Sequence, residues 1–281
     1  MRLHTYLLTV GREILVGRTL DTNAHWLAGE ITRLGGTILK ISCVDDHPQA
    51  IGAEVRSARR HGSDVLVTTG GLGPTPDDVT LEGIASAAGR RLRLSRAART
   101  LIEERYRVLH AQGRISDPAL NPARLKMARL PTGTTPLPNP IGTAPGAYLT
   151  WGRLHIFALP GVPAEMKALF AHEVNPRIEA LSCAAGSGTW VEMRVPTGMN
   201  DESTLAPVLA ALRRAFPDVY AKSHPSGFGV AVDLIVTVAV RGSGGRAARE
   251  RASAARAYLL NRLSVCARSG GPRRPRRSSA S

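Results

Sequence analysis

The chain has 281 residues, of which 43% are hydrophobic, so it can bury one large core or two ordinary ones. The formal net charge of +15 is strongly basic. No apolar run approaches the 18 residues of a membrane-spanning helix, which excludes that class of protein. Cys43, Cys183 and Cys266 are widely spaced and show neither a disulfide framework nor a zinc pattern. We therefore expect a cytoplasmic protein.

Strands and helices alternate along the first part of the chain. Short apolar runs predict strands over residues 3–10, 37–44 and 64–69. Apolar residues at helical spacing and local stop signals predict helices over residues 22–34, 48–61, 80–88 and 96–109. This alternating order favours an α/β fold in which a mostly parallel sheet is covered by helices.

The stretch 111–146 is rich in proline, so it is predicted to be mostly irregular, with one short helical turn at 121–127. A long irregular segment within a compact domain is often functional. Beyond it, a strand is predicted over residues 154–159 and a helix over residues 164–172.

A second unit is predicted from residue 186 onward. It contains a strand at 190–195, an amphipathic helix at 203–216, an alternating strand from Val230 to Val240 and a helix at 246–263. Arginine, glycine, proline and serine dominate the last residues, which predicts a disordered basic tail. We expect a first domain at 1–180, a small α+β domain at 188–265 and the tail at 266–281.

A glycine-rich loop follows the third predicted strand. It reads Thr69-Gly70-Gly71-Leu72-Gly73-Pro74-Thr75-Pro76-Asp77-Asp78-Val79-Thr80. Glycine permits positive φ angles and close approach of a ligand. The helix that follows presents unpaired N–H groups and the positive end of its dipole. Because such a corner at the carboxyl end of a parallel strand favours anions, the loop predicts a phosphate site.

Three carboxylates are predicted to meet at the same edge of the sheet. Glu13, Asp46 and Asp78 each come after a predicted parallel strand. Carboxylates beside a phosphate favour a divalent cation, so Asp46 and Asp78 are candidate catalytic and metal-binding residues. Structural alternatives stay open, because Asp46 can cap the helix at residue 48 and Asp77 and Asp78 can compensate a helix dipole.

Two later segments are candidate walls of this site. Residues 139–146 form a loop of small residues and prolines, and residues 159–166 form a second corner between a strand, a glycine and a helix. No serine lies in a Gly-x-Ser-x-Gly setting, and no P-loop sequence is present. The sequence therefore favours binding of a phosphorylated ligand over serine hydrolase or P-loop chemistry.

The motifs resemble the molybdopterin-binding domain family of molybdenum-cofactor biosynthesis, and more closely the N-terminal domain of the CinA (competence/damage-inducible protein) family. They are Val10-Gly11-x-Glu13-Ile14-Leu15-x-Gly17, Asp21-Thr22-Asn23-Ala24, Val44-x-Asp46, the 69–80 loop, Asn139-x-x-Gly142-Thr143-Ala144-Pro145-Gly146 and Leu159-Pro160-Gly161-Val162-Pro163-x-Glu165-Met166. The resemblance covers roughly residues 3–178. Residues 190–263 resemble the small KH-type domain that follows in CinA.

The resemblance implies a three-layer α/β/α domain followed by a KH-like α+β domain, and a homo-oligomer. It implies a phosphorylated ligand of molybdopterin or ADP-ribose type. In the pterin enzymes, aspartates matched by Asp46 and Asp78 serve adenylyl transfer; in CinA-like proteins the domain is associated with ADP-ribose pyrophosphatase activity that needs a divalent metal (Mg²⁺, Mn²⁺ or Co²⁺). The residues expected to bind the ligand are Glu13, Asn23, Thr69, Gly70, Gly71, Gly73, Pro74, Thr75, Gly142, Thr143, Pro160 and Gly161.

Two departures from the family pattern matter. Arg12 stands where many members have an acidic or small polar residue, which favours a phosphate contact over a metal ligand. The chain ends after the small domain, so the amidase activity of longer CinA proteins is not expected.

Two rival hypotheses remain beside the pyrophosphatase. The same cleft could serve a non-catalytic sensor of molybdopterin or a nucleotide. A nucleic-acid-binding protein would need a Gly-x-x-Gly loop between helices of the second unit, and residues 190–263 contain none so placed. We therefore expect a small phosphorylated ligand as the partner, and neither nucleic acid nor a membrane.

Overall fold

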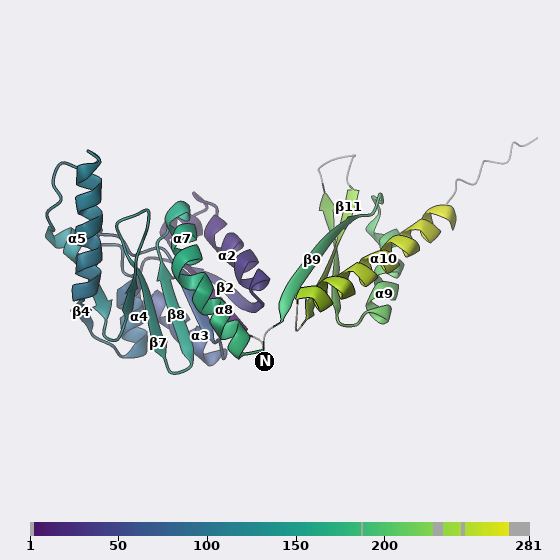
Figure 1. Ribbon diagram of the computed structural model, residues 1–281, viewed down its shortest axis with the longest axis horizontal. Coiled ribbons are helices and arrows are strands. Elements are labelled where there is room, and N and C mark those ends of the chain that lie inside the picture. Colours follow the sequence, from purple (N-terminus) through teal and green to yellow (C-terminus); the bar gives the residue numbers. More distant parts are fainter. Residues whose placement is uncertain (1–2, 187, 227–232, 243–244, 270–281) are drawn as a thin grey trace, which may run out of the picture. The chain divides into compact units, whose positions relative to one another are not determined.

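The computed structural model describes residues 3–186, 188–226, 233–242 and 245–269. The chain divides into two compact units, Met1–Ser187 and Gly188–Ser281 (Figure 1). None of the helices in these described ranges is long and apolar enough to cross a membrane.

Unit 1 is built on a six-stranded sheet with the order β2-β1-β3-β8-β7-β6. The strands are β1 (Leu3–Val10), β2 (Gly36–Val44), β3 (Val65–Thr69), β6 (Thr135–Leu137), β7 (Gly146–Trp151) and β8 (Leu154–Leu159). Strands β2, β1, β3 and β8 are parallel, whereas β7 is antiparallel to both of its neighbours. The reversal follows from the two-residue connection between β7 and β8, because only antiparallel strands can be joined by so tight a turn.

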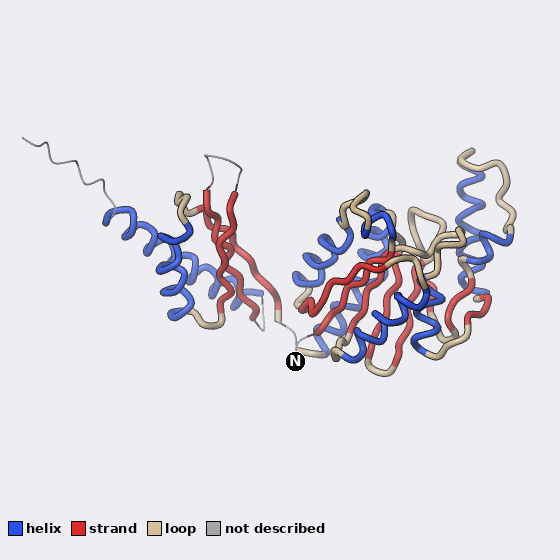
Figure 2. The backbone as a smooth tube through the Cα atoms, turned by 180° about the vertical axis from the view of Figure 1, so that it is seen from behind, coloured by secondary structure: helices blue, strands red, loops and turns tan. Residues whose placement is uncertain are grey.

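Helices cover both faces of this sheet. They are α1 (Arg12–Leu15), α2 (Thr22–Arg33), α3 (Pro48–Arg60), α4 (Thr80–Ala88), α5 (Arg96–Ala111), α6 (Pro122–Lys126), α7 (Pro163–Leu169) and α8 (Asn175–Ala184). One apolar core contains residues of α2, α7 and α8, and the other contains residues of α3, α4 and α5. Figures 1 and 2 show the two faces from opposite sides. The predicted three-layer α/β/α fold with a mostly parallel sheet is confirmed.

Alternation along β1 explains why two cores form. Tyr6 and Leu8 lie in the core with α3 and α4, whereas Leu3 and Leu7 lie in the core with α2 and α7. Successive side chains of a strand point to opposite faces, so a strand buried on both sides reads as a continuous apolar run.

The helix predicted over residues 164–172 is longer and interrupted. Its α7 segment leads into a π-helical turn at Phe170–Val174, and α8 continues to Ala184. Pro176 has no N–H to donate to the carbonyl four residues before it, and its ring would clash with that carbonyl. Widening the turn removes the clash, which accounts for the π-helical geometry at this place.

The proline-rich stretch is more regular than predicted. It contains β5 (Arg129–Pro131), which pairs with β4 (Leu92–Leu94), and the edge strand β6, which pairs only with β7. Pro136 lies in β6, where an edge position leaves the missing N–H without consequence.

Unit 2 is a small α+β unit with an antiparallel sheet of order β10-β11-β9. Its elements are β9 (Thr189–Pro196), α9 (Glu202–Ala215), β10 (Val219–Ser226), β11 (Asp233–Gly242) and α10 (Gly245–Ser269). Leu205 and Leu212 of α9 and Leu259 of α10 share an apolar core with the sheet. Helix α10 extends four residues into the segment predicted as a tail. Residues 270–281 of that tail, and Val230 and Val232 of the predicted strand, lie outside the described residues.

A cleft at the carboxyl ends of the parallel strands

A cleft of about 430 Å³ lies where β1, β3 and β8 end. Of the residues expected at the site, all except Thr75 and Gly142 line it: Glu13, Asn23, Asp46, Thr69, Gly70, Gly71, Gly73, Pro74, Asp78, Thr143, Pro160 and Gly161. The lining also includes Thr9, Gly11, Leu72, Asp77, Ala144 and Glu165. Residues from six separate sequence segments therefore meet in one concave surface.

The floor of the cleft depends on two left-handed glycines. Gly70 has φ +95° and Gly71 has φ +65°, values that residues with a Cβ rarely adopt. The hydroxyl of Thr80 donates to the carbonyl of Gly70 at 2.8 Å, and the N–H of Thr80 donates to the carbonyl of Gly71 at 3.1 Å. The first residue of α4 thus fixes the loop against the start of its own helix.

The three strand-end loops touch through backbone atoms. A Cβ atom at Gly70 would lie 2.1 Å from the carbonyl oxygen of Val10, and one at Gly161 would lie 3.3 Å from the Cα of Gly70. The N–H of Gly70 also donates to the carbonyl of Leu159 at 3.0 Å. The floor can therefore hold this shape only with glycine at position 70.

Asp78 shapes the glycine-rich loop from within. Its Oδ2 accepts hydrogen bonds from the N–H of Thr75 at 2.8 Å and from the Thr75 hydroxyl. The same oxygen would lie 2.6 Å from a Cβ at Gly73, so glycine makes room for the carboxylate. Thr75, expected to bind ligand, thus lies outside the cleft lining and holds Asp78 in place. A hydrogen bond with Thr75 also lowers the pKa of Asp77, which stays ionised at neutral pH.

Asp46 ties the first loop to the edge of the sheet. Its Oδ2 accepts the N–H of Arg12 at 2.9 Å, at the start of α1. The guanidinium of Arg12 lies 3.5 Å from Asp45 and is largely exposed. Arg12 is absent from the residues that line the cleft. Its side chain lies against Asp45 outside the cleft lining, and a phosphate contact of Arg12 stays a prediction.

The carboxylates of the cleft do not form a ready-made metal cage. Within residues 3–186, 188–226, 233–242 and 245–269, no three histidine, cysteine, aspartate or glutamate side chains are grouped to hold a metal ion. Mg²⁺ commonly uses one or two carboxylates together with substrate phosphates and water. Asp46 and Asp78 fit that second pattern, because each uses only Oδ2 in the loop hydrogen bonds described above.

Two buried polar atoms beside the cleft lack a partner in the described part of the chain. Asn23 donates from Nδ2 to the carbonyl of Gly161 at 2.7 Å, but its Oδ1 accepts nothing, although the residue is only 8% exposed. The hydroxyl of Thr69, a residue that is 2% exposed, also has no hydrogen-bond partner among the described residues. Buried polar groups usually find a partner, so these atoms indicate a place for polar ligand groups.

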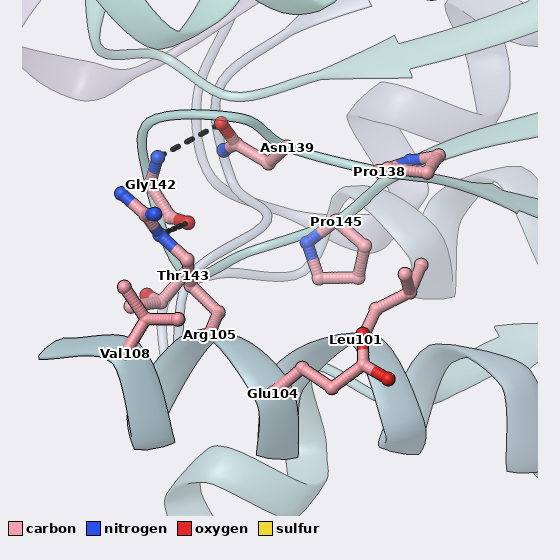
Figure 3. Close-up of a pocket in the computed structure, with 9 residues that line it drawn as sticks. All are labelled: Leu101, Glu104, Arg105, Val108, Pro138, Asn139, Gly142, Thr143 and Pro145. Carbon is pink, nitrogen blue, oxygen red and sulfur yellow. Dashed lines mark hydrogen bonds between the residues drawn. The ribbon is translucent and has the colours of Figure 1, made fainter. Parts of the chain in front are cut away.

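The wall loop, residues 139–146, is held by side chains (Figure 3). Asn139 accepts the N–H of Gly142 at 2.8 Å and donates to Glu165 at 2.8 Å. Arg105 of α5 donates to the carbonyl of Gly142 at 3.0 Å and to the carbonyl of Ile141. Glu165 fills the space that a Cβ at Gly142 would need.

On its far side, the wall loop borders a smaller pocket of about 200 Å³ against α5. Thr143 lines both this pocket and the cleft, whereas Gly142, expected to bind ligand, lines only the smaller pocket. Gly142 is therefore placed as part of the support of the wall and not as part of the cleft surface.

Sequence patterns missed Lys126 and Arg105 as supports of the cleft. Lys126 donates from Nζ to the carbonyls of Thr75 and Asp78, and so braces the glycine-rich loop from α6. It is one of only four lysines in an arginine-rich chain, but that rarity does not specify a role. Both residues lie in segments far from the loops they hold, which only the tertiary structure reveals.

Cys43 lies near the cleft but is not an activated nucleophile. Burial raises its pKa, and the carboxylates of Asp21, Glu13 and Asp46 raise it further. The thiol therefore stays protonated at neutral pH, and the thiolate is the reactive form.

Comparison with known proteins identifies the family. A model of the probable molybdopterin binding domain matches residues 6–180. A protein of Pyrococcus horikoshii is 42% identical over 230 residues, which cover 82% of this chain and 87% of that protein. A protein of Aeropyrum pernix is 40% identical over 239 residues, which cover 85% of each chain.

A solved structure agrees with this assignment. The protein CinA of unknown function from Thermoplasma acidophilum is 38% identical, with a TM-score of 0.57, and the match covers 63% of this chain and 98% of that chain. The family match spans more than half of the chain, and its residues contain the complete cleft. The chain therefore belongs to the molybdopterin-binding domain family and is similar to CinA.

Proposed function

We propose that unit 1 binds a phosphorylated ligand of molybdopterin or ADP-ribose type in the cleft. The observation that carries this proposal is the pair of left-handed glycines, Gly70 and Gly71, which follow β3 and are hydrogen-bonded to Thr80, the first residue of α4. Backbone N–H groups and the positive end of the helix dipole suit a phosphate at this corner. Asn23 and Thr69 then offer polar groups to the remainder of the ligand.

The catalytic part of the proposal is hydrolysis of a pyrophosphate such as that of ADP-ribose. A water oxygen would join one phosphorus, the bond from that phosphorus to the bridging oxygen would break, and the products would be AMP and ribose 5-phosphate. A divalent metal, when bound, would offset the charge of the phosphates. Asp46 and Asp78 would hold it, and one of the cleft carboxylates would accept the proton of the water.

Binding is tested by calorimetry with ADP-ribose and with molybdopterin. We expect wild-type protein to bind at least one of them and Gly71→Val to bind neither, because a Cβ at this position would lie 2.3 Å from Oγ1 of Thr80. Gly17→Val is the matched control, since Gly17 also has positive φ but nothing lies within 4 Å of its Cβ position. Wild-type protein that gives no heat with either ligand would refute the binding proposal.

Turnover is tested by AMP release from ADP-ribose with Mg²⁺, Mn²⁺ or Co²⁺. Asp78→Asn keeps an oxygen that can accept from Thr75 but removes the charge, so we expect binding to persist and AMP release to fall by about 100-fold or more. Asp117→Asn, an exposed change outside the cleft lining, serves as control. Binding without AMP release from wild-type protein would favour the non-catalytic sensor.

For unit 2 we propose the KH-type relationship. The support is its element order, β9-α9-β10-β11-α10, with both helices sharing one core with the sheet. A solved structure of unit 2 with a different strand connectivity would reject this relationship without affecting the cleft.

A further inference from the structure

A further pocket, called the arginine pocket below, lies at the amino ends of β3 and β8, away from the cleft and from the smaller pocket against α5. It measures about 390 Å³ and lies between the end of α3 and the turn that joins β7 to β8. The polar and aromatic residues of its lining are Arg59, Ser63, Asp64, Trp151 and Arg153. None of these residues lines the cleft, so the two concave surfaces are separate.

The C-terminal turn of α3 borders this pocket. Gly62 has φ +70°, its N–H donates to the carbonyl of Arg59, and the N–H of Ser63 donates to the carbonyl of Ala58, each at 3.1 Å. These are bonds of the Schellman type. Because carbonyls of the last turn are paired in this way, less negative charge from the helix end faces the pocket.

Arg59 is held in place by an aromatic ring. Its guanidinium lies 4.2 Å from the centre of the Trp151 ring. No salt bridge joins Arg59 to a carboxylate anywhere in the described part of the chain. Stacking leaves the edge of a guanidinium, with its N–H groups, available for an oxyanion.

The second guanidinium is only partly neutralised. Arg153 lies 3.7 Å from Oδ1 of Asp64, and its side chain is 83% exposed. Oδ2 of Asp64 accepts a hydrogen bond from the backbone N–H of His4 at 2.9 Å, so this carboxylate is shared between Arg153 and the backbone. The pocket lining thus contains two guanidinium groups and one carboxylate, which leaves a net positive charge.

Ser63 adds a hydroxyl that has no partner in the described residues. The residue is 5% exposed, and its Oγ is buried without a hydrogen bond. Buried hydroxyls are usually paired, so this one indicates a missing polar neighbour. It lies among the residues that enclose the pocket, together with both guanidinium groups.

We propose that this pocket is a second ligand site, which binds a phosphate monoester. The planar N–H forks of Arg59 and Arg153 match phosphate oxygens, and the Ser63 hydroxyl can donate to a third oxygen. The half-buried indole of Trp151 offers an apolar wall to the organic part of the ester. The volume exceeds that needed for a phosphate group alone and falls in the range of small-molecule sites.

The site is tested on the full chain by calorimetry with AMP and with inorganic phosphate. To keep the cleft out of the measurement, all variants carry Gly71→Val. We expect AMP to bind one site per chain in this background, inorganic phosphate to compete with it, and Arg59→Met with Arg153→Met to weaken AMP binding by about tenfold or more. Arg60→Met, beside Arg59 but outside the pocket lining, should leave it unchanged.

A second measurement guards against loss of folding in the double variant. In the NMR spectrum of the full chain, AMP should shift the indole N–H signal of Trp151, assigned by its absence in Trp151→Phe, and Arg59→Lys should reduce that shift at equal ligand concentration. An unshifted Trp151 signal, or AMP affinity equal in the double variant and its parent, would overturn the proposal. The Trp151 signal reports on this pocket and not on the cleft, so the two proposals fail independently.

Discussion

Gly70 is the position at which the shape of the cleft depends most directly on a single residue. Alanine there must adopt φ +95° and bring its Cβ against the Val10 carbonyl. Gly89 also has positive φ, +63°, but its Cβ position is open. We expect Gly89→Ala to lower the free energy of unfolding by about 1 kcal/mol, and Gly70→Ala to lower it by about 3 kcal/mol or more.

Urea unfolding of the two variants measures this difference. Equal losses would show that the backbone contact at position 70 relaxes at little cost. Because both variants bear the cost of positive φ, the comparison isolates the contact between Gly70, after β3, and Val10, at the end of β1.

We expect the stability of unit 1 to depend on pH through His155. Its Nδ1 lies 2.7 Å from the Tyr148 hydroxyl, and burial lowers its pKa below the ordinary value of 6.5, although Asp64 partly offsets this. Below about pH 6.5 the unfolded chain binds a proton that the folded chain does not, so stability falls as pH falls through that value and towards the lower folded pKa.

The His155→Gln variant tests this dependence. It keeps a polar side chain but cannot titrate, so we expect its melting temperature to change less than that of wild type between pH 8 and pH 5.5. Identical pH profiles would mean that His155 is not the group responsible.

For individual residues, the sequence predicted which of them lie close together. The strand-end positions of Glu13, Asp46, Gly70 and Gly161 predicted a common edge, and the structure places all four in the cleft lining. The sequence could not distinguish residues that line the cleft from residues that hold its loops in place, as Thr75 shows. That distinction depends on side-chain direction within a turn, which residue types alone do not specify.

Among the elements, α5 supports the cleft from outside. Arg105 donates to two carbonyls of the wall loop, and the neighbouring Arg107 is exposed and has no such contact. Bonds from a charged donor are strong, but solvent weakens them at a half-exposed site. We expect Arg105→Met to lower the free energy of unfolding by about 1 kcal/mol and to speed proteolytic cleavage within residues 139–146.

Arg107→Met is the control, because it removes the same charge from the same helix. Limited proteolysis with mass spectrometry locates the cuts, and urea unfolding gives the energy. If both variants are cut at the same rate, the wall loop does not depend on Arg105.

Regular elements were predicted where a single apolar period dominates. The bounds of β1, α4 and β8 match the prediction residue for residue. In contrast, β10 carries Pro225 and alternates small and polar residues, and β7 begins at Gly146 beside Pro145, so neither has a clear local signal. Their pairing with β11 and β8 supplies the stability that their own residues do not indicate.

At the scale of the whole molecule, exposed apolar side chains indicate where a second copy could bind. Leu15, Val16 and Leu20 are 51%, 57% and 82% exposed, and Ile41 of the edge strand β2 is 49% exposed. Edge strands and apolar patches are common association surfaces. We expect light scattering to give a mass of at least two chains for wild type, and Leu20→Lys with Ile41→Lys to lower it.

Val108→Lys with Leu94→Lys, two exposed apolar positions on other elements, is the control for the change in charge. A wild-type mass of one chain would reject the expected homo-oligomer. Dissociation by the control pair alone would place the interface elsewhere.

The class of fold followed from the order of elements, because parallel strands require crossover helices that leave a recognisable period. The reversal at β7 and the two-residue turn after it were not predicted. They place Trp151 and Arg153 beside the end of α3, so the arginine pocket could not be derived from sequence spacing.

The floor and the wall of the cleft are built in different ways, and this has a consequence for redesign. The loops after β1, β3 and β8 meet through backbone atoms, so an insertion in one of them would displace the other two. The wall loop is fastened by side chains of Asn139, Glu165 and Arg105. We therefore expect that residues 140–145 can be exchanged for those of a relative without changing the backbone contacts that form the floor.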